Sequence, residues 1–180
     1  TPRGERFDKE FTTQTSAYEI LRMILRAGHS HFTVDDSRVS AVREGVQPLR
    51  GIIGPDAQTA QLKVAFSAPS EDDFSGVDAE YIDPVTFTKQ TVRCRLPGLD
   101  AVKVETFTAE GMDRLGAWRA GMRKLMKHRL QRTTATTSTG LSSLVHGYLD
   151  HVAFTDNIPT DQHMSALIRG VTIAEGLARI

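Results

Sequence analysis

The stretch RLGAWRAGMRKLMKHRLQR, residues 114 to 132, holds the longest helical pattern in the chain. Its large apolar side chains recur every three or four residues, and they are Leu115, Trp118, Met122, Leu125, Met126 and Leu130. A stripe with this period predicts an amphipathic helix over residues 114–131, with the stripe facing the core. Trp118 and Met122 are therefore the predicted anchors of that core.

A row of basic side chains runs along the same predicted helix. Arg119, Arg123 and Lys127 follow one another four residues apart, on a face away from Trp118. The row repeats a positive charge about every 6 Å, a spacing that would suit contacts with phosphates. The helix has one aromatic residue, on its apolar side, so no base-stacking platform accompanies the charge. We expect a surface that faces solvent, a neighbouring subunit or the lumen of a conduit for nucleic acid. A nucleic-acid-binding module built on helix 114–132 is the alternative.

Segments on both sides of this helix alternate apolar and polar residues, as strands with one buried face do. Residues 77–82 and 91–96 flank a turn that starts at Asp83-Pro84, which predicts a hairpin that ends at Pro97-Gly98. Further strands are predicted at residues 102–108, 133–139, 147–159 and 166–173. We expect the helix to lie across a β-layer formed by the segments on either side of it.

The first part of the chain predicts a smaller lobe. Ser16 and Glu19 form a capping box, apolar residues then recur at helical spacing, and Gly28 suits a left-handed C-terminal position, so a helix is predicted over residues 17–27. Residues 32–34 and 38–42 read as two strands joined by the turn at 35–37. We expect this hairpin to lay its apolar residues on the helix.

Residues 45–60 contain two prolines and three glycines, so they are predicted to form a loop and the internal boundary. The predicted fold is therefore α+β. Residues 1–60 form a small lobe of one helix and a β-hairpin. Residues 61–180 form a larger lobe of mixed or antiparallel strands packed on one long amphipathic helix.

Composition restricts the class of protein without selecting a partner. The 180 residues carry 22 basic and 22 acidic side chains, and a hydrophobic content of 39% is ordinary for a soluble globular protein. A single cysteine, Cys94, cannot form an internal disulfide, and no apolar run approaches the roughly 20 residues that span a bilayer. Because the chain starts at Thr1 without methionine and stops within a strand-like pattern, we expect a fragment of a longer protein.

Motifs for common chemistries do not occur in the sequence. It has no P-loop, no dinucleotide-binding glycine motif and no nucleophile elbow, and strand alternation predicts a buried structural thiol for Cys94. The histidines lack metal-site spacing, and the acidic cluster that starts at Glu71-Asp72-Asp73 lacks the pattern of a calcium loop. We predict no catalytic residue, cofactor or metal. A cell-wall hydrolase is the enzymatic alternative, although no acid and base pair can be named for it.

The order of the features carries a family resemblance. The stretches SGVDAEYIDPVTFTKQTVRCRLPG (75–98), VKVETFTAEGMDRLGAWRAGMRKLMKHRLQR (102–132) and LSSLVHGYLDHVAFTDNIP (141–159) follow one another. Together they resemble the central region of phage tail-tip host-specificity proteins, the tip attachment family called J in lambda-like phages. The matching residues are 77–81, 95–98, 117–123 and 148–159, and the helix and hairpin at 18–44 resemble the stretch upstream in that family.

This resemblance implies a tail-hub-like fold and a structural role without enzymatic activity. Proteins of that family form a trimeric hub at the end of the tail tube, so the implied partners are two further copies, other tail-tip proteins and tail-tube proteins. The implied location is the virion tail tip, with functions in tail assembly, host attachment and genome delivery. Neither specific nucleic-acid recognition nor a small-molecule substrate is implied. Arg119, Arg123 and Lys127 would then face a neighbouring subunit or the passing genome.

Overall fold

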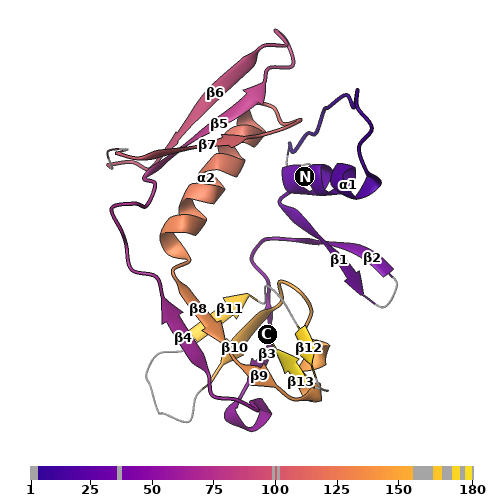
Figure 1. The fold of residues 1–180 in the computed structure, drawn as a ribbon, viewed down its shortest axis with the longest axis vertical. Coiled ribbons are helices and arrows are strands. Elements are labelled where there is room, and N and C mark those ends of the chain that lie inside the picture. Colours follow the sequence, from indigo (N-terminus) through magenta and orange to yellow (C-terminus); the bar gives the residue numbers. More distant parts are fainter. Residues whose placement is uncertain are drawn as a thin grey trace. The chain divides into compact units, whose positions relative to one another are not determined.

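The computed structural model describes residues 4–35, 38–98, 100 and 102–155, together with the backbone of residues 164–167, 172–174 and 177–179. The fold is α+β, as predicted, with two α-helices and several small sheets in the described part of the chain (Figure 1). Contacts group the chain into two units, one of Thr1–Arg43 and Ala68–Arg132, the other of Glu44–Ser67 and Thr133–Ile180. The separate lobes predicted for residues 1–60 and 61–180 stay a prediction.

The first unit is built on a three-stranded sheet with the order β6-β5-β7. Strand β5 (Gly76–Ile82) pairs antiparallel with β6 (Lys89–Arg95) and parallel with β7 (Val104–Thr108). Val77, Ala79 and Cys94 are completely buried on one face of the hairpin. The predicted hairpin with one buried face is thus confirmed, and the parallel pairing of β7 makes the sheet mixed.

Helix α2 (Arg114–Leu130) covers that buried face, close to the predicted bounds of 114–131 (Figure 1). It begins at the N-cap Asp113, whose carboxylate accepts a hydrogen bond from the backbone N–H of Gly116 at 2.7 Å. The side chains that meet the sheet are small or medium in size. Ala117, Gly121 and Leu125 are the buried residues of this helix.

The prediction that Trp118 anchors the core is wrong, because this residue is 42% exposed. Leu115, Met126 and Leu130 of the predicted stripe are also exposed, whereas Met122 packs partly against the core. The reason lies in Gly121, where a Cβ would come within 2.5 Å of Sγ of Cys94. So close an approach of helix and sheet leaves no room for an indole between them, and the large side chains lie along the next row of the helix.

Helix α1 (Ala17–Ala27) and the hairpin of β1 (Ser30–Asp35) and β2 (Arg38–Arg43) also belong to the first unit. Ser16 caps the helix by accepting a hydrogen bond from the N–H of Glu19, as predicted. Tyr18 meets Phe32 edge to face, with ring centroids 5.6 Å apart, so the hairpin does pack on the helix. The left-handed backbone conformation was predicted for Gly28 but occurs at His29: φ is −88° at Gly28 and 51° at His29. The helical turn thus continues one residue beyond its predicted end.

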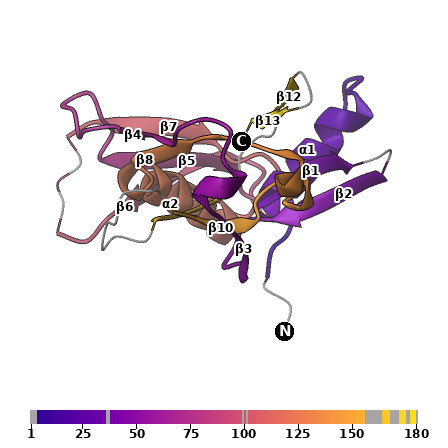
Figure 2. The ribbon, with the colours of Figure 1, turned by 90° about the horizontal axis from the view of Figure 1, so that it is seen from below.

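The second unit consists of short strands. β10 (His151–Phe154) lies parallel to β3 (Leu49–Ile53) and antiparallel to β11 (Met164–Leu167), and β3 and β10 lie side by side in Figures 1 and 2. Ile53, Val152 and Phe154 form its core. β13 (Leu177–Arg179) pairs with β12 (Thr172–Ala174) and β9 (Ser138–Thr139). β4 (Lys63–Phe66) pairs with β8 (Thr133–Thr136).

Two predictions for this unit need correction. Residues 45–60 are not a plain loop, since they contain β3 and the short 3-10 helix Pro55–Ala57; the prolines and glycines flank β3 or lie within it. The strand predicted from residue 147 begins only at His151. Leu149 (φ 65°) lies in a turn that the Asp150 carboxylate holds by accepting from the N–H of Gly147. The predicted ends of that strand at 156–159, and residues 168–171 of the last predicted strand, lie outside the described residues.

Neither α-helix in the described ranges is long and apolar enough to cross a membrane.

Candidate functional site

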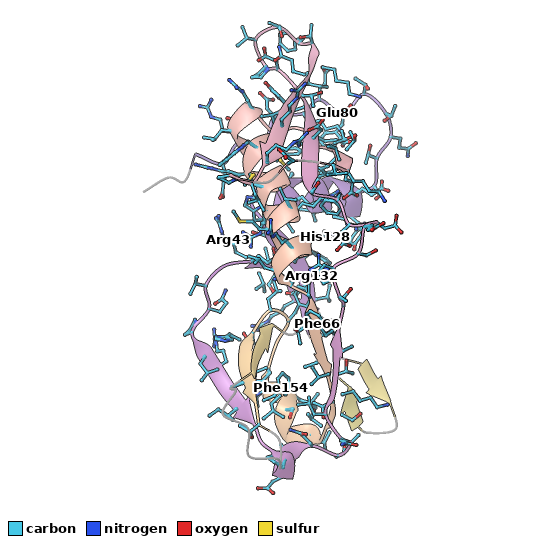
Figure 3. All side chains as sticks on the ribbon, turned by 90° about the vertical axis from the view of Figure 1, so that its left-hand side faces the viewer. Arg43, Phe66, Glu80, His128, Arg132 and Phe154 are labelled. Carbon is cyan, nitrogen blue, oxygen red and sulfur yellow. The ribbon has the colours of Figure 1, made fainter. Side chains whose placement is uncertain are left out.

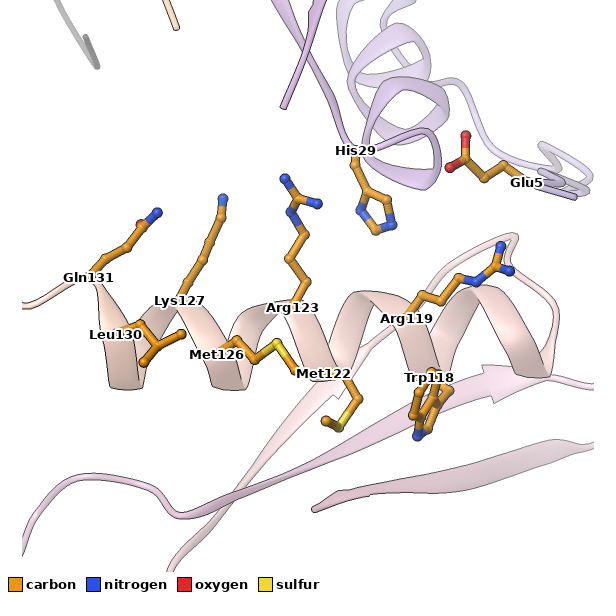
Figure 4. A pocket seen from close by; sticks show the side chains of 10 residues that line it. All are labelled: Glu5, His29, Trp118, Arg119, Met122, Arg123, Met126, Lys127, Leu130 and Gln131. Atoms are coloured by element: carbon orange, nitrogen blue, oxygen red, sulfur yellow. The ribbon is translucent and has the colours of Figure 1, made fainter. Parts of the chain in front are cut away.

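An apolar groove with a basic rim runs along helix α2 in the first unit (Figure 4). Its floor consists of Trp118, Met122, Met126 and Leu130, which follow one another four residues apart. Its volume is about 810 Å³. Four of the six side chains that the sequence placed in the core therefore line a surface groove, whereas Leu125 is buried as predicted.

The rim of the groove is the predicted basic row. Arg119, Arg123 and Lys127 project from the same side of α2 toward His29 and Glu5 of the N-terminal segment (Figure 4). All three cations also make interactions within the chain. The structure thus brings the three predicted site residues together on one surface, beside the apolar floor that the sequence assigned to a different role.

Lys124 and His128 of the helix, and Arg132 just after it, do not line the groove and lie in ion pairs. Lys124 Nζ lies 2.9 Å from a carboxylate oxygen of Glu105 on strand β7, and Arg132 Nη2 lies 2.6 Å from Asp73. His128 lies in the last turn of α2 and Arg132 follows directly after the helix (Figure 3). The basic side chains therefore form two rows. Lys124, His128 and Arg132 form a structural row of ion pairs, and Arg119, Arg123 and Lys127 form the row at the groove.

Asp73 holds the structural row in place. Its carboxylate accepts from Arg132 and from the backbone N–H of Ser70, and these hydrogen bonds lower the pKa of Asp73, the bond from Arg132 most. His128 Nε2 lies 3.2 Å from the same carboxylate, and the imidazole stacks on Phe74 with centroids 3.9 Å apart. The cluster fastens the end of α2 to the segment that enters β5.

Cys94 is a structural thiol, as predicted. It is completely buried under Gly121 with Sγ 3.6 Å from the carbonyl oxygen of Trp118. Burial raises the pKa of the Cys94 thiol. A nucleophilic thiol needs both access and a lowered pKa, so this side chain suits packing and not attack on a substrate.

Most side chains of the acidic cluster form ion pairs within the first unit. Asp72 pairs with Lys103, Asp78 with Arg95, and Glu80 with Lys89. Within the ranges that the structure describes, no three histidine, cysteine, aspartate or glutamate side chains converge as metal ligands would. His163 and Asp161 lie outside these ranges. The groove along α2 offers binding through apolar contact and charge.

One signal in the sequence could have located the groove. Ala117 and Gly121 are spaced four apart on the helix, and small residues in such a row mark the face where a helix backbone approaches its neighbour most closely. The row of larger side chains beside it then cannot lie in the interface. Periodicity alone does not distinguish these two rows, because both repeat every four residues.

Comparison with known proteins gives a fold relationship. Neither a family model nor a curated protein sequence matches the chain. A chain in the virion of a native gene transfer agent particle superposes with a TM-score of 0.66 at 18% identity, covering 88% of this chain and 36% of that one. A tail protein from Neisseria meningitidis MC58 gives a TM-score of 0.61 at 13% identity, with 95% and 54% covered.

The 43 kDa tail protein of prophage MuSo2 from Shewanella oneidensis gives a TM-score of 0.59 at 14% identity, with 95% of this chain and 52% of that one covered. The chain therefore shares its fold with two solved tail proteins and with a chain of the gene transfer agent virion. It spans about a third of the length of the virion chain and about half of the length of each tail protein.

Proposed function

We propose that the chain is a structural component of a phage or prophage tail, and more specifically part of the hub at the tail tip. The carrying observation is the fold similarity to two tail proteins and to a virion chain, which extends over 88% to 95% of this chain. The ordered sequence motifs described above support the finer assignment to the hub of a host-specificity protein.

In this proposal the protein works as a scaffold and not as an enzyme. Three copies dock on the tail tube, close or gate its lumen, and transmit receptor engagement to opening at the virion tail tip. The partners are other tail-tip and tail-tube proteins. The ion-paired end of α2 and the close approach of Gly121 to Cys94 are compatible with such a scaffold role.

Arg119, Arg123 and Lys127 have a specific place in the proposal. A row of cations beside an apolar floor suits a protein neighbour better than water, because desolvated apolar area supplies affinity while the rim charges set orientation. We assign this row to a subunit-facing surface. Its other proposed position, facing the lumen and the passing genome, would expose the apolar floor to water.

Removing the coding sequence from the phage or prophage that encodes it tests the proposal. Particles induced from the deletion strain are expected to lack a closed tail tip under the electron microscope. A copy supplied in trans with a peptide tag should restore the tip and carry gold-labelled antibody there. Complete tails with label-free tips, or normal particles from the deletion strain, would contradict the assignment.

The second candidate is a nucleic-acid-binding module that uses helix 114–132. The observation in its favour is that Arg119, Arg123 and Lys127 project from one side of α2 (Figure 4). Titration with short duplex and single-stranded DNA at two salt concentrations separates the candidates. Phosphate binding through these cations weakens steeply with salt, and replacing one of them by serine lowers the salt slope by about one unit. Lys63→Ser, on an exposed strand, is the matched control. The scaffold proposal predicts negligible affinity in every case.

A further inference from the structure

The turn between strands β5 and β6 forms an exposed apolar tip. Ile82 is 63% exposed, Val85 82% and Phe87 81%. Single apolar residues on a surface need no explanation, but three large ones gathered at one turn form a patch that favours contact with another molecule. We call residues 82–88 the hairpin tip.

The hairpin tip is held in one conformation by Asp83. Its carboxylate accepts hydrogen bonds from the backbone N–H of Val85 at 3.2 Å and from Oγ1 of Thr86 at 2.9 Å. The carbonyl oxygen of Asp83 accepts from the N–H of Phe87 at 2.8 Å. A tip organised in this way loses little conformational entropy on binding.

Phe87 itself is strained. Its φ of 51° lies in the left-handed region, which bulky side chains rarely adopt. Strain of this kind persists where the surrounding structure enforces it, and it is concentrated at sites that bind. Here it presents an aromatic ring to solvent at the end of a hairpin.

The groove on α2 is complementary to this tip in both polarity and charge. Its floor of Trp118, Met122, Met126 and Leu130 is apolar and contains deformable methionines. Its rim carries three cations and one acid, Glu5, which is paired with Arg43. The hairpin tip contains one charged side chain, the acidic Asp83. An apolar finger with a single negative charge fits an apolar groove edged by positive charge.

Within one copy the tip and the groove cannot meet. β5 runs antiparallel to α2, since Phe74 before the strand stacks on His128 near the end of the helix, and Ala79 packs under Gly121. The hairpin tip therefore projects beyond the beginning of the helix (Figure 1). Only a second molecule can bring a tip to this groove.

We infer that the hairpin tip of one copy inserts into the α2 groove of the next copy. This head-to-tail contact is heterologous, and a heterologous contact repeated three times closes a ring when its rotation is one third of a turn. The inference rests on the proposed homotrimeric hub and identifies the surfaces that would form it. Phe87 and Val85 are the inserted side chains, and Trp118 and Met126 receive them.

Cysteine crosslinking tests the contact. Val85→Cys and Met126→Cys are made separately in the 180-residue chain, and a short bifunctional maleimide is added. Mixing the two variants should give covalent dimers, and the double variant should give dimers and trimers. Each single variant alone should stay monomeric on a denaturing gel, and this also checks that buried Cys94 does not react.

A matched pair of substitutions measures the energetic role of the tip. Phe87→Gly removes the ring and relieves the positive φ, so it should not lower stability, while it weakens self-association in sedimentation experiments by about tenfold or more. Val39→Ser removes another exposed apolar side chain, 65% exposed against 81% for Phe87, on β2 and should leave association unchanged.

Each contrary outcome has a definite meaning. Crosslinking of Val85→Cys with itself, or an oligomer in which the mixed variants fail to crosslink, would overturn the tip-in-groove contact while leaving the hub proposal standing. A chain that is monomeric at every concentration also overturns the contact, and the deletion experiment above then decides the hub separately. Loss of vesicle binding by Phe87→Gly, with self-association intact, would assign the tip to a lipid surface instead.

Discussion

Replacing Gly121 by alanine probes how closely helix α2 approaches its sheet. A Cβ at residue 121 would lie 2.5 Å from Sγ of Cys94 and 3.4 Å from Cβ of Ala79. The first distance is roughly 1 Å shorter than an optimal contact between nonbonded atoms. Both partners lie on regular elements, so either the helix or strand β6 must shift.

The expected loss follows from two opposing effects. Alanine is about 1 kcal/mol more favourable than glycine inside a helix. Forcing a methyl group into a packed core costs about 1–3 kcal/mol, and here a shift also disturbs the buried neighbours Ala117 and Leu125. We expect a net loss of about 1–2 kcal/mol in the free energy of unfolding, which corresponds to a fall in Tm of roughly 2–8 °C for a chain of this length.

A double-mutant cycle separates the clash from other causes. Cys94→Ala removes the sulfur and should cost about 1 kcal/mol by itself. In the double variant the nearest remaining contacts of the new methyl group are 3.4 Å and 3.5 Å, which are tight but ordinary. The double variant should therefore be more stable than Gly121→Ala alone, with a coupling energy of about 1 kcal/mol or more.

Urea unfolding, followed by circular dichroism and by the fluorescence of the single tryptophan, measures all four free energies. Gly45→Ala, where a Cβ meets nothing within 4 Å, is the control and should raise stability by about 0.4–1 kcal/mol. If Gly121→Ala matches the wild type, or if the losses at residues 121 and 94 simply add, the close approach of helix and sheet does not limit this core.

Three further predictions concern the same unit. Asp113→Ala removes the N-cap of α2 and should lower the free energy of unfolding by about 1 kcal/mol, whereas Asp113→Ser should retain most of it; chemical denaturation compares the two. Because Arg132 lowers the pKa of Asp73 in the folded protein, this carboxylate stabilises the fold above its unfolded pKa of about 4 and loses that effect as pH falls through the lower folded value. Asp73→Asn should accordingly be less stable than the wild type at neutral pH and equally stable in strong acid, and a deficit that is constant with pH would exclude this linkage. The thiol of Cys94 should react with Ellman's reagent only as fast as the protein opens and at once in denaturant, so rapid labelling of the native protein would show that the core is accessible.

Local sequence patterns predicted many of the helices and strands. The helix at 17–27 with its cap at Ser16, the hairpin around Asp83-Pro84 and the long helix from Arg114 were all predictable, because caps, turns and alternation act over a few residues. Predictions failed where a partner from elsewhere in the chain decides the outcome. Residues 49–53 become strand β3 only because β10 pairs with them from about a hundred residues away.

The candidate site shows the same division. Arg119, Arg123 and Lys127 were predicted as one row, since spacing by four on a helix is a local property. The apolar floor beside them was assigned to the core, because large apolar side chains at helical spacing are usually buried. Exposure of the hairpin tip likewise had no local signal, since alternation predicts strand faces but not what covers the turn that joins them.

The sequence by itself determined the order and type of the main elements, because hydrogen bonding and side-chain periodicity within a helix or hairpin depend on neighbours close in the chain. The tertiary structure alone decided which row of α2 is buried. A helix that lies against Cys94 and Ala79 needs the thin row of Ala117 and Gly121 at the contact, and this excludes the bulk of Trp118. Steric fit between segments thus converts a predicted core into an exposed groove.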